Sequence, residues 1–198
     1  MRAVSGRRAA RLLAQAALLA LLAATGARGA EDFSVETVRR GSAVEVTCRA
    51  TLRAPHELIW QTLTDYNRLS EFIPGMHKSR VLEVRGLTSI VEQIGEVRFL
   101  VFTFPIEVTV ASTARPPDLL EVQVLKGSLK RLDGAYRFEA LEDGRTILHW
   151  RGLIEPDAPM PPLIGELLMR ASITDQFQGM VDEIERRDAL RRAQERAR

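Results

Sequence analysis

The 198-residue sequence has a single cysteine, Cys48, and only three histidines. An intramolecular disulfide needs two thiols, so the chain forms none. The histidines, His56, His77 and His149, have no metal-ligand spacing with Cys48, which excludes a cysteine-based zinc site. Cys48 lies in the alternating run 44–50, where we expect a buried or half-buried strand thiol that behaves as a small hydrophobic residue. We therefore predict no metal site and no cofactor.

The chain also lacks the excess of positive charge that is typical of nucleic-acid-binding proteins. Lys and Arg number 28 against 26 Asp and Glu, but five of the arginines lie within residues 1–29, where there is no acidic residue. The rest of the chain has 23 basic and 26 acidic residues, a net charge of −3. Because phosphate backbones are bound mainly through Lys and Arg, we expect no nucleic-acid partner.

Residues 1–29 have the order of regions that is typical of a secretory signal peptide. Four arginines precede an apolar run at 12–24, and small residues follow it. The run has 13 residues and spans roughly 20 Å as a helix, less than a bilayer core of ~30 Å. We predict cleavage near Ala27 to Ala30, after Ala27 or Gly29, and a periplasmic or secreted protein. A permanent membrane anchor is the alternative.

From about Phe33 onward, apolar residues recur with the period of two that is typical of strands. A long strand is predicted at 42–53, and two short helices follow it, one beginning at Pro55 and one at 66–72 with Asp65 as its N-cap. The same period then predicts six further strands, separated by turn residues, at 78–84, 89–99, 101–111, 119–125, 134–141 and 146–154. Strands in this succession are typical of an antiparallel meander.

After Pro161 the period changes to that of a helix. Apolar residues between Ile164 and Ile184 recur at spacings of mostly three and four, which predicts an amphipathic helix of about 23 residues before Arg186. An arginine-rich tail follows, which we expect to be either a solvated continuation of this helix or a frayed end. We therefore divide the chain into a signal peptide at 1–29, one domain at 30–185 and a charged tail at 186–198.

This order of elements predicts an α+β fold, in which a curved antiparallel sheet wraps around the long C-terminal helix. The apolar face of the sheet and the apolar stripe of the helix bury each other, and such an arrangement often leaves an elongated hole that suits apolar ligands. Tyr136 and Trp150 are the best cavity candidates, because each joins an aromatic ring to a polar group. The candidate lining residues are Phe102, Phe104, Val122, Val124, Tyr136, Phe138, Trp150, Leu167 and Phe177. The alternative is that these residues fill a closed core.

No catalytic residue is predicted. A general base needs a histidine or carboxylate in the cavity, whereas His149 alternates with Leu148 and Trp150 and is expected to face away from it. Serine and aspartate residues are scattered without a nucleophile motif. Binding is therefore expected rather than catalysis, although an enzyme that steers a reactive chain by pocket shape alone stays open.

Three stretches resemble a known family. Residues 54–81 contain the elements A-P-x-x-x-x-W, T-D-Y and F-x-P-G-x-x-x-S-x-V, and residues 127–138 match G-x-x-x-x-x-x-G-x-W with Tyr136 in place of Trp. The third stretch is the P-x-x-L/I opening of the last helix at Pro161. Together they resemble the polyketide cyclase/dehydrase and coenzyme Q-binding branch of the START-like superfamily, over roughly residues 42–185. The resemblance implies a helix-grip fold with a lipid- or polyketide-type cavity.

The expected function is binding of a hydrophobic small molecule, such as a lipid or an isoprenoid quinone, by an exported carrier or chaperone. The resembling family also includes aromatase/cyclases and a ribosome-association toxin, and export argues against both of these cytosolic roles. A cyclase-like enzyme and a ligand-free interaction module remain the alternatives. The ligand, the oligomeric state and peripheral contact of the arginine-rich tail with a membrane stay open.

Overall fold

The computed structural model describes residues 30–99, 102–158 and 165–198, except for the side chains of Phe99 and Phe102. The predicted signal peptide and the helix opening at Pro161 lie outside these residues. Within them, eight antiparallel strands form one sheet in the order β1-β2-β8-β7-β6-β5-β4-β3. The strands are β1 (Glu31–Arg40), β2 (Ala43–Leu52), β3 (Met76–Arg85), β4 (Thr88–Phe99), β5 (Phe102–Arg115), β6 (Leu119–Gly127), β7 (Leu129–Ala140) and β8 (Thr146–Pro156).

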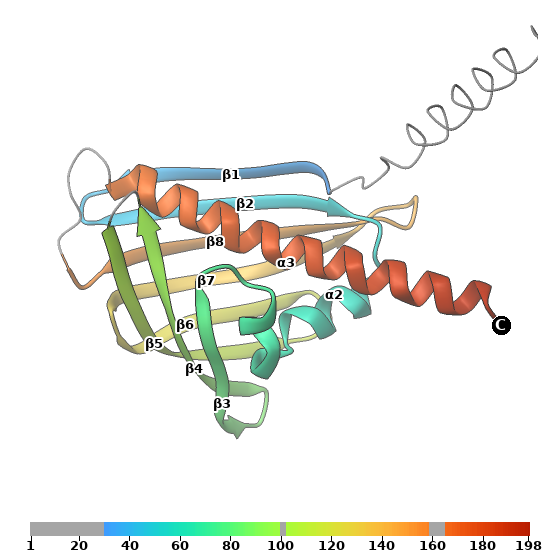
Figure 1. Ribbon diagram of the computed structural model, residues 1–198, viewed down its shortest axis with the longest axis horizontal. Helices are drawn as coiled ribbons and strands as arrows, with labels where there is room; N and C mark the ends of the chain where they lie inside the picture. Colours follow the sequence, from blue (N-terminus) through green and yellow to red (C-terminus); the bar gives the residue numbers. More distant parts are fainter. Residues whose placement is uncertain (1–29, 100–101, 159–164) are drawn as a thin grey trace, which may run out of the picture.

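Three helical segments accompany the sheet, namely α2 (His56–Leu63), the 3-10 helix η1 (Tyr66–Glu71) and the long α3 (Gly165–Arg196). Figure 1 shows the curved sheet wrapped around α3, which begins beside the ends of β4 and β5 and runs past α2. This arrangement confirms the predicted α+β fold with a long C-terminal helix.

Strand β1 differs from the prediction, which placed two short helices after the first strand. The structure places them after the second, because residues 31–40 form a strand of their own that pairs with β2. Val35 is the buried residue of this edge strand, and the rest of it is exposed or half-buried. A strand with so few buried positions carries only a weak apolar period.

Helix α3 runs through the arginine-rich tail to Arg196, so the tail continues the helix and is not a frayed end. Its last turns carry no apolar stripe, but ion pairs at helical spacing join Asp188 to Arg191 and Arg192, and Arg191 to Glu195. Residues three and four apart lie side by side on a helix, so these pairs favour helix where apolar packing has ended.

The second half of α3 lies directly on the segment around η1. A Cβ built at Gly179 would lie 2.5 Å from the carbonyl oxygen of Phe72, so only glycine lets the two backbones approach this closely. Asp65, predicted as an N-cap, forms no cap hydrogen bond. Its carboxylate instead accepts a hydrogen bond of 2.9 Å from the Arg187 guanidinium, a bond in which both partners are charged.

The solid core of the protein lies between β2, β8, α2 and the second half of α3. Its fully buried side chains include Val46, Ile59, Leu148, Val181 and Ile184. The first half of α3 faces a different part of the sheet, where β4 to β7 curve away from it. The candidate site lies in that space.

Candidate functional site

A cavity of about 750 Å³ lies between the concave face of the sheet and α3. Its wall on the sheet side is mostly apolar, and Leu69 of η1 and Ile73, just after η1, add to it. Helix α3 contributes one continuous face, at spacings of three and four, from Gly165 through Leu168, Met169, Ser172, Ile173, Gln176 and Phe177 to Met180. The helix stripe and the sheet therefore enclose a space that their side chains do not fill.

A row of side chains across four strands forms the inner part of the cavity. Cys48 of β2 pairs with Trp150 of β8, Trp150 with Tyr136 of β7, and Tyr136 with Leu120 of β6. Residues that pair across antiparallel strands point to the same face, so all four side chains face α3. Cys48, Trp150 and Leu120 are buried, which places Tyr136 deep in the molecule.

Two glycines make room for the indole of Trp150. Gly134 and Gly152 lie opposite each other on β7 and β8, and a Cβ at either would lie 2.6 Å or 2.9 Å from the indole ring. The indole ring therefore lies over these two glycines, which form the neighbouring cross-strand pair on the same face of the sheet. Glycine inside a strand is a sequence signal for such close approach, but sequence reasoning noticed only Gly134, as a motif residue.

Two tyrosine hydroxyls line the cavity, and they differ in their partners. The Tyr66 hydroxyl donates a hydrogen bond of 2.8 Å to the Ser112 hydroxyl. The Tyr136 ring lies 4.7 Å from the Trp150 ring, between centroids. Burial raises the pKa of both tyrosines, so both hydroxyls stay protonated at neutral pH.

The thiol of Cys48 is also part of the cavity wall. Burial raises its pKa to about 12, so at neutral pH it is a protonated thiol and a weak nucleophile. The expectation of a buried strand thiol is confirmed, because Cys48 is 1% exposed.

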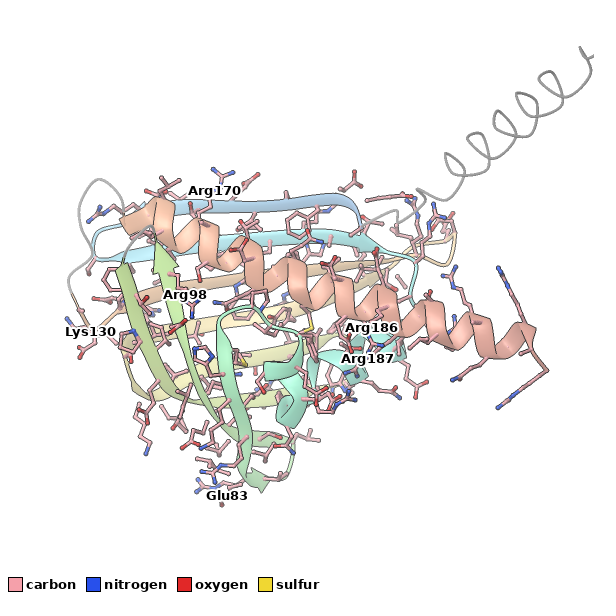
Figure 2. All side chains as sticks on the ribbon, in the orientation of Figure 1. Glu83, Arg98, Lys130, Arg170, Arg186 and Arg187 are labelled. Carbon is pink, nitrogen blue, oxygen red and sulfur yellow. The ribbon has the colours of Figure 1, made fainter. Side chains whose placement is uncertain are left out.

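Figure 1 shows the ends of β4 and β5 beside the first turn of α3, and residues of all three elements line this end of the cavity. Phe104 lines the cavity and yet is 40% exposed, so the cavity reaches the surface beside this residue, and we call this end its opening. Among the described lining residues, only Glu96 and Asp157 are charged, and both lie at this end. Glu96 is paired with His77 at 3.4 Å and with Arg98, which Figure 2 shows beside the first half of α3.

Five of the nine predicted lining residues line the cavity, and three do not. The lining five are Phe104, Val122, Tyr136, Trp150 and Phe177. Val124 instead packs against a small buried cluster of Val91, Val108 and Val110, and Leu167 is 58% exposed on α3. Phe138 lies under α2, its ring 4.9 Å from that of His56 and 5.6 Å from that of Trp60. The side chain of Phe102 lies outside the described residues.

Several lining residues were missed by sequence reasoning, among them Tyr66, Ser112, Ser172 and Gln176. The polar residues of α3 occupy the same helical face as Leu168 and Phe177, so counting by three and four from either would have found them. By the same count Leu167 falls on the neighbouring face, one residue from Leu168. No sequence signal identifies Tyr66 and Ser112, which lie 46 residues apart.

Within the described parts of the chain, no cluster of three or more His, Cys, Asp or Glu residues has a geometry that would hold a metal ion. In the same parts, none of the helices has the length and hydrophobicity needed to cross a membrane. The arrangement as it stands can hold an elongated apolar molecule, with hydroxyl groups at the inner end and charge at the opening.

Comparison with known proteins gives a family match and several similar folds. Residues 52–181 match the family described as polyketide cyclase / dehydrase and lipid transport. No curated protein sequence matches. A STAR-related lipid transfer protein from Xanthomonas axonopodis is 14% identical, with a TM-score of 0.65 over 80% of this chain and 96% of that one.

Two further solved structures are similar. Zhui aromatase/cyclase from Streptomyces sp. R1128 is 20% identical, with a TM-score of 0.61 over 73% of this chain and 95% of that one. A START superfamily protein from Mycobacterium smegmatis is 14% identical, with a TM-score of 0.61 over 72% and 97%. At such identities the likeness shows a shared fold.

Proposed function

Since the chain belongs to the polyketide cyclase/dehydrase and lipid transport family, we propose that it is a carrier of a hydrophobic small molecule. The observation that carries this proposal is the cavity of about 750 Å³, with apolar side chains over most of its wall. A cavity of this size and character is the usual form of a small-molecule site.

The shape of the cavity favours a long guest. Its lining on α3 extends from Gly165 to Met180, which corresponds to roughly 22 Å at 1.5 Å per residue. Burying ten methylene groups contributes about 8 kcal/mol before ordering costs are subtracted. An isoprenoid or acyl chain would thus be held without any special polar contact, and a lipid or isoprenoid quinone fits this description.

A carrier is supported over a cyclase-like enzyme by the chemistry of the wall. In the described residues, the inner part of the cavity has no histidine or carboxylate that could act as a general base. The Cys48 thiol is protonated at neutral pH and is a weak nucleophile. Turnover of a polyketide chain by the purified protein would favour the enzyme instead.

We also propose that the protein acts outside the cytoplasm, because residues 1–29 have the pattern of a secretory signal peptide. N-terminal sequencing of the mature protein tests this. A first residue between 28 and 31 is expected, and uncleaved protein in the cytosolic fraction would contradict export.

The binding proposal is tested by native mass spectrometry of the purified protein, followed by extraction into organic solvent. The wild type is expected to carry an extractable lipid. Val122→Trp places an indole inside the cavity and should abolish the adduct, whereas Leu167→Trp, at an exposed position on α3, should retain it. Absence of any bound lipid, even after incubation with a total lipid extract, would support the ligand-free interaction module.

A further inference from the structure

The inner row of the cavity contains a hydroxyl group that the protein leaves unused. Tyr66 donates its hydroxyl to Ser112, but within the described chain no group forms a hydrogen bond with the Tyr136 hydroxyl. Tyr136 nevertheless lines the cavity, beside the buried Trp150 and Leu120. Tyr136 is half-buried, and a hydroxyl group that faces an apolar cavity without a protein partner is free to form a hydrogen bond with a guest molecule.

The surroundings of Tyr136 suit a neutral hydrogen-bond acceptor. Its neighbours in the row are a thiol, an indole and a leucine, and the charged lining residues in the described chain, Glu96 and Asp157, lie at the opening. A charged group at the inner end would lose its hydration without gaining an ion pair. Because burial raises the pKa of Tyr136, its hydroxyl keeps the proton that it would donate.

We propose that Tyr136 donates a hydrogen bond to a carbonyl or hydroxyl oxygen at the buried end of an uncharged ligand. The ligand enters with this end first, its polar oxygen beside the Tyr136 and Trp150 rings, and its apolar chain extends along α3 toward Phe104. This inference rests on the proposed carrier function and names the class of its cargo: long, neutral molecules with an oxygen-bearing terminal group, as in a methyl ketone or a quinone.

Two probes that differ only in the oxygen test the inference. The dissociation constants of 2-tridecanone and tridecane are measured by displacement of a fluorescent apolar probe from the delipidated protein. The wild type is expected to bind the ketone about tenfold more tightly than the hydrocarbon, as one hydrogen bond in an apolar site predicts. Tyr136→Phe should remove this preference by weakening ketone binding alone, and Leu167→Ala, away from the cavity, should keep it.

A second measurement does not depend on a variant. The chain has two tyrosines, so protein with ring-labelled tyrosine gives two sets of NMR signals. The ketone is expected to shift the Tyr136 Cζ signal further than tridecane does, because only the ketone accepts its proton. The Tyr66 signal should respond alike to the two probes, since its hydroxyl already donates to Ser112.

The possible outcomes separate this inference from the proposed function. If both probes bind with equal affinity and shift the Tyr136 signal equally, the proposed hydrogen bond from Tyr136 is overturned and the carrier function stands. If neither probe nor any lipid binds, the carrier function is contradicted, and the hydrogen bond from Tyr136 to a ligand is contradicted with it. A ketone preference that survives Tyr136→Phe would also overturn the role of this hydroxyl.

Discussion

At the scale of the residue, the cavity depends on where a single indole lies. Trp150 occupies the space over Gly134 and Gly152, and any side chain at either glycine would push the ring toward α3. Two residues without side chains thus determine how much of the cavity stays open.

Gly134→Ala tests this dependence. The added Cβ would lie 2.6 Å from the indole, so the ring must move into the cavity. We expect a loss of about 1 to 3 kcal/mol in the free energy of unfolding, together with a shift in tryptophan fluorescence. Ala135→Val, which adds volume to the opposite face of the same strand, should stay within about 0.5 kcal/mol. Equal effects of the two substitutions would contradict the account.

Glu183 is the buried carboxylate that positions Arg187, which links α3 to Asp65 at the start of η1. It accepts hydrogen bonds of 2.6 Å from Arg186 and 2.7 Å from Arg187, and Arg187 in turn binds Asp65. Figure 2 shows the two arginines next to each other on this part of α3. Removing one partner of a buried ion pair leaves the other charge uncompensated.

Glu183→Gln is therefore expected to lower the free energy of unfolding at pH 7 by about 2 to 3 kcal/mol. Glu185→Gln is the matched control on the same helix. Burial and the nearby Asp182 raise the pKa of Glu185, so its charge does not stabilise the fold. Urea denaturation of both variants measures the difference, and a larger loss for the control would refute this role of Glu183.

The same carboxylate makes stability depend on pH. Hydrogen bonds from Arg186 and then Arg187 lower the pKa of Glu183 from 4.5 to about 2, despite its burial. A group with a lowered folded-state pKa stabilises the fold above its unfolded pKa, and this contribution is lost as pH falls toward the folded value. Between pH 4.5 and pH 2 the wild type should lose more stability than Glu183→Gln, as denaturation curves at pH 5 and pH 3 would show. Parallel losses would contradict the assignment.

At the scale of the element, α3 is held against the η1 segment by the absence of a side chain at Gly179. Replacement of an exposed helical glycine by alanine stabilises a helix by about 1 kcal/mol. Here the Cβ would lie 2.5 Å from the Phe72 carbonyl oxygen and from Pro74, so alanine at this position should destabilise the protein.

We expect Gly179→Ala to destabilise the protein by roughly 1 to 3 kcal/mol, because the helix must move away from the Phe72–Pro74 backbone. Thermal unfolding measures the change. Ala171→Gly, at an exposed position on the same helix, should cost about 1 kcal/mol from propensity alone. A stabilising effect of Gly179→Ala would mean that α3 does not approach the segment as closely as described.

The elements differ in how far their sequence predicted them. Strands β2 to β8 were each predicted from period two and turn residues, and their ends lie within five residues of the prediction. Strand β1 was missed as a separate strand because it buries little. The sequence left open whether the tail continues α3 or frays, because ion pairs, rather than apolar spacing, accompany the last turns. Hydrophobic periodicity indicates which residues are buried. It therefore does not identify elements that are stabilised by pairing at the edge of a sheet or by ion pairs.

At the scale of the whole molecule, the sequence predicted a sheet wrapped around a helix with a cavity between them, but only part of the set of residues that line it. Tyr136, Trp150 and Phe177 could be assigned to an inner face from their strand or helix alone. Phe138 shares the strand face of Tyr136 but lies under α2 rather than in the cavity, because α2 covers only one end of the sheet. Such a difference depends on how segments far apart in sequence pack together, which local patterns do not encode.

The central claim is that a guest molecule sits between the sheet and α3. Intermolecular NOEs between bound 2-tridecanone and the methyl groups of the labelled protein test it most directly. The account predicts NOEs to Leu120, Val122 and Leu168, which line the cavity, and none to the exposed Leu82, Leu167 or Leu190. NOEs confined to the exposed leucines, with the cavity methyls silent, would contradict it.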